Sequence, residues 1–233
     1  MSLPAQEEKA RTVRDMFDRI APGYDRMNVL MTGGLDRVWR RRLMREVAIK
    51  AGDRVVDLGC GTGDLIELAT RVGAYAVGVD PAGGMLAVAR DRGMGASVVQ
   101  GDALAIPLAD QSVDVVTTAF ALRNVLSIPP VFAESARILR PGGRLAILEV
   151  SQPNFGPARA VHSFYFQTVV PLVGQLLADR EAYRYLPASA AYLPEPPKLI
   201  AMLEEAGFVE VRRISLGAGA VQLLIGSRAG VAS

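Results

Sequence analysis

Residues 53–150 alternate short apolar runs with stretches of helical pattern, and this alternation restricts the fold more than any other feature of the sequence. The apolar runs are rich in β-branched residues and predict strands at 54–58, 74–79, 96–100, 113–119 and 144–150. The stretches between them predict helices near 64–72, 84–92 and 130–139. Strands joined by helices form a parallel sheet with helices on both faces, and such strands are apolar along their whole length. The sequence therefore predicts an α/β fold with a Rossmann-like sheet.

The segments on either side of this core complete a single predicted domain over 1–233. Residues 1–50 predict a helical cap of two helices, 7–20 and 35–48, joined by a turn-rich link. Residues 151–195 contain five prolines and have weak periodicity, which is typical of a lid or substrate insertion. The last part, 196–233, predicts a helix near 196–206 and two strands, 209–215 and 219–226. We expect these strands to form an antiparallel hairpin at the edge of a mostly parallel, seven-stranded sheet.

Composition narrows the class of protein. Half of the 233 residues are hydrophobic, but dense apolar stretches such as 145–150 are far shorter than the roughly 18 residues of a membrane span. The charged N-terminus does not resemble a secretory signal, so we expect a cytoplasmic location. One cysteine and one histidine exclude a Cys/His zinc site, and no metal is expected. A net charge of +2 does not favour nucleic acid as a partner.

Five arginines crowd one predicted helix, around Trp39: Arg37, Arg40, Arg41, Arg42 and Arg45. One interpretation is an ordinary solvated helix face. Another is a cationic amphipathic helix that rests on anionic lipid headgroups, which would place the protein on the inner face of a membrane. RNA binding is a third interpretation and the weakest of them.

A glycine-rich loop follows the first predicted strand: Asp57-Leu58-Gly59-Cys60-Gly61-Thr62-Gly63-Asp64. Glycines let the backbone approach a ligand closely, and the start of the next helix offers N–H groups. Asp80 ends the second strand, 21 positions after Gly59, where a carboxylate can accept both ribose hydroxyls of a nucleoside cofactor. A nicotinamide dinucleotide site would show the same features.

Two further details favour S-adenosylmethionine as the cofactor. The loop spacing is G-x-G-x-G rather than G-x-G-x-x-G, and Asp57 and Asp64 flank it. These carboxylates would repel a pyrophosphate but attract an ammonium or a sulfonium. Asp102 and Ala103 follow the third strand, where the acidic side chain can reach adenine N6. We therefore predict that 51–150 is the cofactor-binding core of a class I methyltransferase, with Gly59, Gly61, Thr62 and Gly63 in the cofactor loop.

Four stretches outside the glycine loop resemble the ubiquinone/menaquinone biosynthesis C-methyltransferase family. They are Phe17 to Asn28 with Trp39-Arg40, Phe120-Ala121-Leu122-Arg123-Asn124-Val125, Leu148 to Pro153, and Pro171 to Gly174 followed by Tyr183 to Ser189. The resemblance covers nearly the whole chain and implies methylation of a ring carbon of a prenylated quinol, with demethylmenaquinol as the best candidate. The chain departs from the family at Ala119, where Ser or Asn is usual, at Asp36, where His is usual, and at 221–226, which lack a His.

Roles for individual residues follow from this resemblance and from the chemistry of a phenolic substrate. Arg123 is expected to face the methyl donor and stabilise the quinol anion, while Asp25 is a candidate base that could equally cap a helix. His162 is a weaker catalytic candidate. Further predicted contacts are Tyr24 and Ala119 with the cofactor, and Asn124, Tyr165, Tyr183 and Tyr185 with the substrate.

Other functions remain open from the sequence. The chain could methylate another apolar or phenolic small molecule, or be a catalytically silent cofactor-binding subunit. A nicotinamide-dependent oxidoreductase is opposed by the loop spacing and its carboxylates. An RNA methyltransferase would carry an Asn/Asp-Pro-Pro-aromatic motif where this chain has Thr118-Ala119-Phe120-Ala121. A homodimer is a further open alternative.

Overall fold

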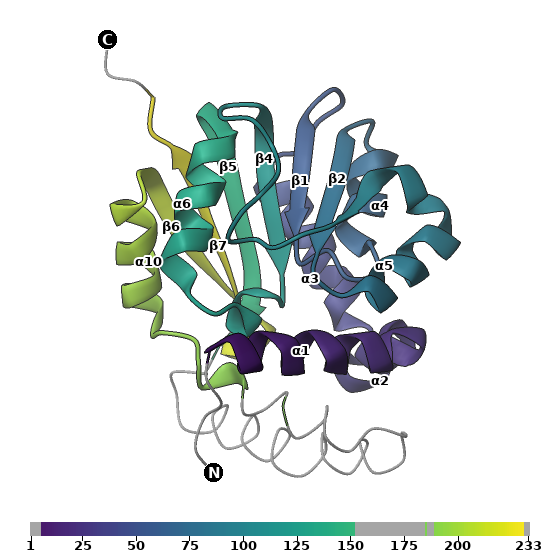
Figure 1. Ribbon diagram of the computed structural model, residues 1–233. Helices are drawn as coiled ribbons and strands as arrows, with labels where there is room; N and C mark the ends of the chain where they lie inside the picture. The colour runs from purple at the N-terminus through teal and green to yellow at the C-terminus, as the bar shows by residue number, and fades with distance from the viewer. Residues whose placement is uncertain (1–5, 152–184, 186–188, 231–233) are drawn as a thin grey trace.

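Seven strands form one sheet in a computed structural model that describes residues 6–151, 185 and 189–230 (Figure 1). In chain order the strands are β1 (Arg54–Leu58), β2 (Tyr75–Asp80), β3 (Val98–Gln100), β4 (Val113–Ala119), β5 (Leu139–Val150), β6 (Phe208–Leu216) and β7 (Val221–Arg228). Their order in the sheet is β3-β2-β1-β4-β5-β7-β6. The first five strands are parallel, and β7 runs antiparallel to both β5 and β6. The predicted fold class, including the antiparallel C-terminal strand, is confirmed.

Helices cover both faces of the sheet because alternate strand residues are buried on opposite sides. Val55 packs with the face covered by α3 (Leu35–Glu46), α4 (Asp64–Arg71) and α5 (Gly83–Ala89). Its neighbour Val56 packs with the face covered by α6 (Ile128–Ile138) and α10 (Pro196–Glu205). This is the two-sided burial that the continuous apolar strands predict.

The N-terminal cap contains one helix more than the sequence predicted. After α1 (Gln6–Ile20) and the turn η1 (Ala21–Gly23), the predicted link forms α2 (Tyr24–Thr32). None of its residues is fully buried, and its apolar residues are gathered less clearly on one face than those of α1 or α3, so the helical signal is weak. Gly33 and Gly34 end α2 with φ angles of +60° and +79°, which glycine adopts without strain. Figure 1 shows α1 crossing the end of the sheet where the parallel strands finish.

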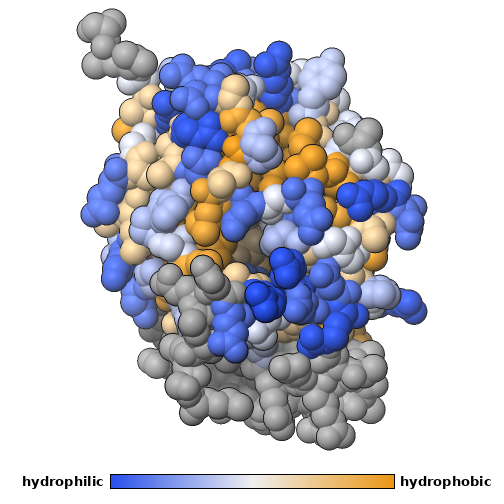
Figure 2. All heavy atoms as spheres, viewed as in Figure 1, coloured by the Kyte–Doolittle hydropathy of each residue, from blue (hydrophilic) through white to orange (hydrophobic). Residues whose placement is uncertain are grey.

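The connection from β3 to β4 crosses one face of the sheet without a helix. Val77 on β2 and Val99 on β3 are 37% and 42% exposed. Figure 2 shows apolar residues gathered on the same side of the molecule. Before this connection, α5 ends at Ala89 and continues as a wide turn, η2 (Arg90–Met94), and a short turn, η3 (Gly95–Ser97), so that β3 is shorter than predicted.

Within the described ranges, no helix has both the length and the apolar content needed to cross a bilayer.

Candidate active site

A cavity of about 440 Å³ lies where the carboxyl ends of the parallel strands meet α1. In open α/β sheets ligands bind at this edge. One wall consists of side chains of α1 together with Tyr24. The opposite wall includes seven of the residues predicted from sequence: Gly59, Gly61, Asp80, Asp102, Ala103, Ala119 and Asn124. Most of the remaining lining residues are apolar, including Leu104, Leu122, Val125 and Leu126.

The glycine loop is shaped by close packing on one side and by open space on the other. Gly59 has a φ of +66°, and a Cβ there would lie 2.4 Å from the Cβ of Ala121. Gly61 has a φ of +53°, but a Cβ there would meet no atom within 4 Å. Gly59 therefore lets the loop pack against the segment after β4, and the backbone of Gly61 is open to a ligand.

Asp80 holds this loop from the end of β2. Its Oδ2 accepts a hydrogen bond from Gly61 N at 2.8 Å, and its Oδ1 accepts one from Ala82 N at 2.8 Å. Burial raises the pKa of this carboxyl above its usual range. A carboxylate oxygen has a second lone pair, so the same group can accept ribose hydroxyls while it fixes the loop.

Asp57 lies behind the loop and is almost fully buried. Its Oδ1 accepts a hydrogen bond from Thr117 Oγ1 at 2.8 Å. Desolvation raises the pKa of Asp57 to about 7, while Thr117 and the Arg40 guanidinium oppose the rise. A cation placed beside this carboxyl would favour its charged form.

Arg40 is buried, so it does not belong to the solvated helix face that was one interpretation of the five arginines. It belongs to the inward stripe of α3 with Asp36, Leu43 and Met44, because positions one and two turns apart share a helix face. Arg40 Nη1 lies 3.2 Å from Asp36 Oδ2, and its Nε lies 3.5 Å from Asp64 Oδ2. The guanidinium carbon is 5.3 Å from the ring centre of Phe120.

Arg40 also borders a small hollow beside the glycine loop. Further lining residues of this hollow are Tyr24, Asp57, Gly59, Gly61, Thr62, Asp64 and Ala119. The hollow thus combines one guanidinium with two carboxyls. A charged group of either sign can be bound there, which suits the amino-acid end of S-adenosylmethionine.

Asp25 and Thr62 fasten the N-terminal cap to the glycine loop. Thr62 Oγ1 donates to Asp25 Oδ1 at 2.6 Å, and Arg92 Nη1 lies 3.3 Å from Asp25 Oδ2. Arg92 also donates to the Thr62 carbonyl at 3.0 Å and to Asp64 Oδ1 at 2.9 Å. Asp25 was predicted as a base or a helix cap, and in the structure its Oδ1 binds the loop at Thr62 and its Oδ2 lies beside Arg92 of η2. Arg92 carried no signal in the sequence because it follows α5 in an irregular turn.

The adenine end of the site is more exposed. Asp102 accepts a hydrogen bond from Leu104 N on its Oδ1 at 2.9 Å, and it stabilises the turn that contains Ala103. Ala119 ends β4 and contributes no polar side-chain atom to the cavity. The next residue, Phe120, has a φ of +60°, an uncommon backbone conformation that costs about 1–3 kcal/mol and is concentrated at functional sites.

Arg123 lies beyond this strained turn and is buried against Glu149 of β5. Its Nη1 donates to Glu149 Oε1 at 2.5 Å, and its backbone N donates to Glu149 Oε2 at 3.2 Å. Arg123 Nε donates to Ser189 Oγ at 3.2 Å. These contacts bring the guanidinium against β5 and Ser189, and its expected place facing the methyl donor stays a prediction. Its neighbours Leu122 and Asn124 line the cavity.

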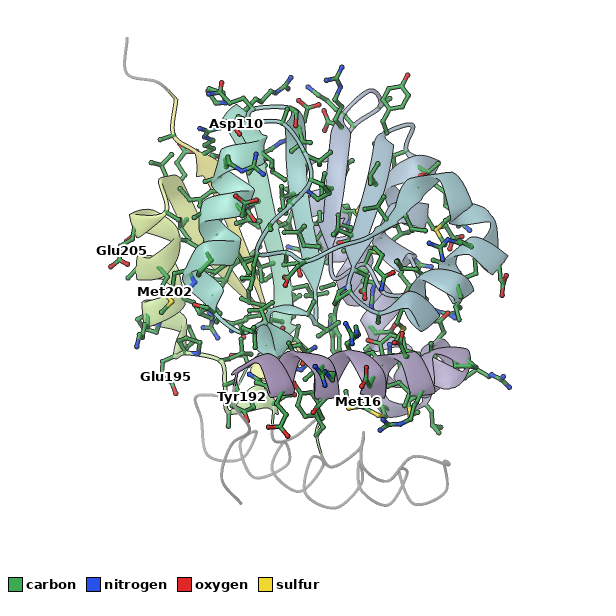
Figure 3. All side chains as sticks on the ribbon, viewed as in Figure 1. Met16, Asp110, Tyr192, Glu195, Met202 and Glu205 are labelled. Carbon is green, nitrogen blue, oxygen red and sulfur yellow. The ribbon has the colours of Figure 1, made fainter. Side chains whose placement is uncertain are left out.

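Asn124 connects the cavity to the segment at Tyr185. The Tyr185 hydroxyl donates to Asn124 Oδ1 at 3.1 Å, and burial raises the pKa of Tyr185 to about 12. A little further along, the Lys9 ammonium of α1 lies 3.8 Å from the ring centre of Tyr192. Figure 3 shows Tyr192 beside the beginning of α1.

The predicted residues His162, Tyr165 and Tyr183 lie outside the described residues. Among the side chains that the structure describes, no three His, Cys, Asp or Glu residues are placed to hold a metal ion. The cavity is therefore characterised by its glycine loop, its strand-end carboxylates and its apolar walls.

This sheet order and this site define a class I S-adenosylmethionine-dependent methyltransferase. The chain belongs to the ubiE/COQ5 methyltransferase family, whose model matches residues 4–228. It is 46% identical over 226 residues to a demethylmenaquinone methyltransferase of Roseiflexus sp. (strain RS-1), covering 94% of this chain and 95% of the relative. It is 39% identical over 221 residues to a ubiquinone/menaquinone biosynthesis C-methyltransferase of Syntrophotalea carbinolica, covering 92% and 93%.

A similar fold occurs in a solved S-adenosylmethionine-dependent methyltransferase of Thermotoga maritima, described as a possible histamine N-methyltransferase. The TM-score is 0.64 at 21% identity, covering 93% of this chain and 99% of that one. At this identity the likeness supports the fold alone.

Proposed function

We propose that this enzyme methylates a ring carbon of a prenylated quinol, with demethylmenaquinol as the substrate and menaquinol as the product. The observation that carries the proposal is the cavity itself. It joins a cofactor loop at Gly59–Gly63 to an apolar wall at Leu122, Val125 and Leu126. The names of the family's similar members support the choice of substrate.

The chemical problem is to make a ring carbon nucleophilic. S-adenosylmethionine supplies an electrophilic methyl group. A phenol has a pKa of about 10, so ionising a quinol hydroxyl at neutral pH costs roughly 4 kcal/mol. A fixed positive charge near the oxygen lowers this cost, and we assign this charge to Arg123, which lies between Leu122 and Asn124 of the cavity wall. Water or a carboxylate would accept the proton.

Glu149 and Ser189 position Arg123 for this role. A buried guanidinium needs a buried counter-charge, and Glu149 binds both the backbone N and the guanidinium of Arg123. With a pKa near 12, Tyr185 stays protonated at neutral pH, and its hydroxyl holds Asn124 at the edge of the cavity. In this proposal Asn124 and Tyr185 orient the quinol oxygens, and Asp25 is a positioning residue for the loop.

Arg40 is assigned to the carboxylate of the methionine moiety, and Asp57 and Asp64 to its ammonium. The hollow beside Gly61 contains this guanidinium and both carboxyls. Asp80 takes the ribose hydroxyls, and Asp102 with Ala103 takes the adenine. Each assignment uses a residue that borders one of the two spaces described above.

The substrate has an isoprenoid tail, which is stable only in lipid or in an apolar groove. We therefore include peripheral contact with a bilayer in the proposal. A homodimer stays a prediction.

The test is methyl transfer to two short-tailed quinols, a demethylnaphthoquinol and a benzoquinol, both kept reduced. We expect the naphthoquinol to be the better substrate by kcat/KM. Arg123→Ala should abolish transfer, and Arg123→Lys should recover only part of it because an ammonium lacks the planar fork. Equal activity of Arg123→Ala and wild type would contradict the proposed role of Arg123. Tight cofactor binding without transfer to either quinol would contradict the proposed substrate.

A further inference from the structure

A second, polar hollow of about 260 Å³ lies among α2, α3, α4 and η2. It shares no lining residue with the large cavity. Its walls carry four carboxylates, Asp25, Asp36, Asp64 and Glu67, and five guanidiniums, Arg37, Arg40, Arg41, Arg71 and Arg92. Such a density of charge raises the question of which groups neutralise one another.

All four carboxylates are already paired with arginines of the same hollow. Arg40 binds Asp36 and Asp64, and Arg71 binds Glu67 at 2.5 Å. Arg92 lies within 3.3 Å of Asp25, Asp64 and Glu67. These three arginines therefore account for every carboxylate in the lining.

Of the five arginines that line the hollow, Arg37 and Arg41 are not part of these ion pairs. Within the part of the chain that the structure describes, neither has a carboxylate partner. They lie four residues apart on α3, so their side chains are neighbours on one helix face, and both are exposed. Two adjacent unpaired guanidiniums at the edge of a hollow form a site for an anion, and phosphate oxygens match their geometry.

Three exposed apolar side chains lie on α2 and α3, and one of them, Val38, is an i,i+3 neighbour of Arg41. Leu35 and Val38 on α3 are 48% and 50% exposed, and Leu30 on α2 is 61% exposed. Large aliphatic side chains beside arginines are typical of surfaces that lie at the boundary between headgroups and acyl chains. A freely diffusing phosphate would gain nothing from these aliphatic groups, whereas a phospholipid contacts both.

We propose that Arg37 and Arg41 bind the headgroup phosphate of an anionic phospholipid, with Leu30, Leu35 and Val38 inserted beside it. The site deepens the bilayer contact in the proposed function and rests on it. It also has a connection to the cofactor, because Arg40 and Asp64 line both this hollow and the one beside the glycine loop.

The test compares two double variants that remove equal charge from the same helix. Arg37→Gln/Arg41→Gln removes both guanidiniums of the proposed site. Arg42→Gln/Arg45→Gln leaves the site intact, since neither Arg42 nor Arg45 lines the hollow. Binding is measured by sedimentation with vesicles of phosphatidylcholine alone and with added phosphatidylglycerol. We expect wild type to bind only the anionic vesicles. The first variant should bind them at least about 30-fold more weakly, and the control no more than about fivefold.

Equal losses in the two variants would contradict a defined site and indicate a diffuse basic surface. Inorganic phosphate provides the second arm, measured by calorimetry. If inorganic phosphate binds and requires Arg37 and Arg41, but neither kind of vesicle binds, the site recognises free phosphate, and the proposed phospholipid ligand is wrong. Tighter binding to a single-stranded RNA than to anionic vesicles at the same salt would overturn it as well.

The methyl-transfer assay separates this proposal from the proposed function. Arg37→Gln/Arg41→Gln should methylate a short-tailed quinol in solution at the wild-type rate. If the wild-type enzyme methylates no quinol but still needs Arg37 and Arg41 to bind anionic vesicles, the proposed substrate is wrong and the proposed lipid site is supported. If the quinol is methylated and the vesicles are not bound, only the lipid site fails.

Discussion

The two sides of the large cavity are held together by contacts of different kinds. On the cofactor side, Gly59–Gly63, Asp80 and Asp102 follow successive strands, and their main hydrogen bonds reach backbone groups nearby, such as Gly61 N and Leu104 N. On the acceptor side, Arg123 and Asn124 depend on side chains from distant segments. Arg123 and Ser189 are 66 positions apart, and Asn124 and Tyr185 are 61 apart. The cofactor residues thus lie at strand ends, where distant pairs such as Asp57 with Thr117 also hold them, and the acceptor residues depend on the segment at Tyr185 and Ser189.

The largest expected effect concerns the buried pair on the acceptor side. Glu149→Ala leaves the Arg123 guanidinium buried without its counter-charge, and should lower the free energy of unfolding by about 3–5 kcal/mol. Urea denaturation measures this. The control is Arg71→Ala, which removes an exposed i,i+4 pair with Glu67 and should cost about 0.5 kcal/mol or less. Similar costs for the two variants would show that Arg123 and Glu149 do not hold the acceptor side together.

On the cofactor side, the expected effect is a pH dependence caused by Asp57. Its pKa is about 7 when folded and near 3.8 when unfolded, so the native state binds more protons between these values. The contribution of Asp57 to the stability of the cofactor-free protein should therefore be greatest below about pH 4 and fall as the pH rises to 7. For this group the loss is roughly 4 kcal/mol. Asp57→Asn should remove the dependence. Urea unfolding between pH 4 and 8 measures it, and parallel curves for the two proteins would contradict the raised pKa.

Arg40 tests which part of the cofactor the hollow recognises. Arg40→Gln should weaken binding of S-adenosylmethionine about 10- to 100-fold, because a charge-assisted hydrogen bond is lost. Binding of 5′-methylthioadenosine, which lacks the amino-acid end, should be unchanged. Arg40→Lys should restore part of the affinity and serves as the control for folding. Equal weakening of both ligands would show that Arg40 only supports the loop.

The smallest expected effect separates the two sides most cleanly. Tyr185→Phe removes the hydroxyl that donates to Asn124, and should lower kcat/KM for the quinol about fivefold, the value of one neutral hydrogen bond. The dissociation constant of the cofactor, measured by calorimetry, should not change. A loss of cofactor affinity in this variant would mean that the two sides are not independent.

The same difference explains what the sequence could predict. The strand–helix alternation and the glycine loop are local patterns, and the sheet, the bounds of β1 and β4, and the positions of Asp80 and Asp102 follow from them. Arg123 and Asn124 could be identified only through resemblance to a family. The partners of Arg123, Glu149 and Ser189, had no separate signal, because these contacts join segments that are distant in the chain.

Two differences from the predictions have physical reasons. The helix α2 was missed because its apolar pattern is weak and glycine-containing turns flank it on both sides. Arg40 was grouped with exposed arginines because charge alone does not reveal that its helix turns it toward Asp36 and Asp64.

The central claim is that the cavity brings the methyl group to a ring carbon. The most direct test is to incubate the enzyme with ¹³C-methyl-labelled S-adenosylmethionine and a reduced, short-tailed demethylmenaquinol. The position of the label in the product is then read by nuclear magnetic resonance. We predict a single labelled methyl on the ring carbon next to a hydroxyl-bearing carbon, lost in Arg123→Ala. A label on the quinol oxygen, or transfer that persists in Arg123→Ala, would contradict this account of the site.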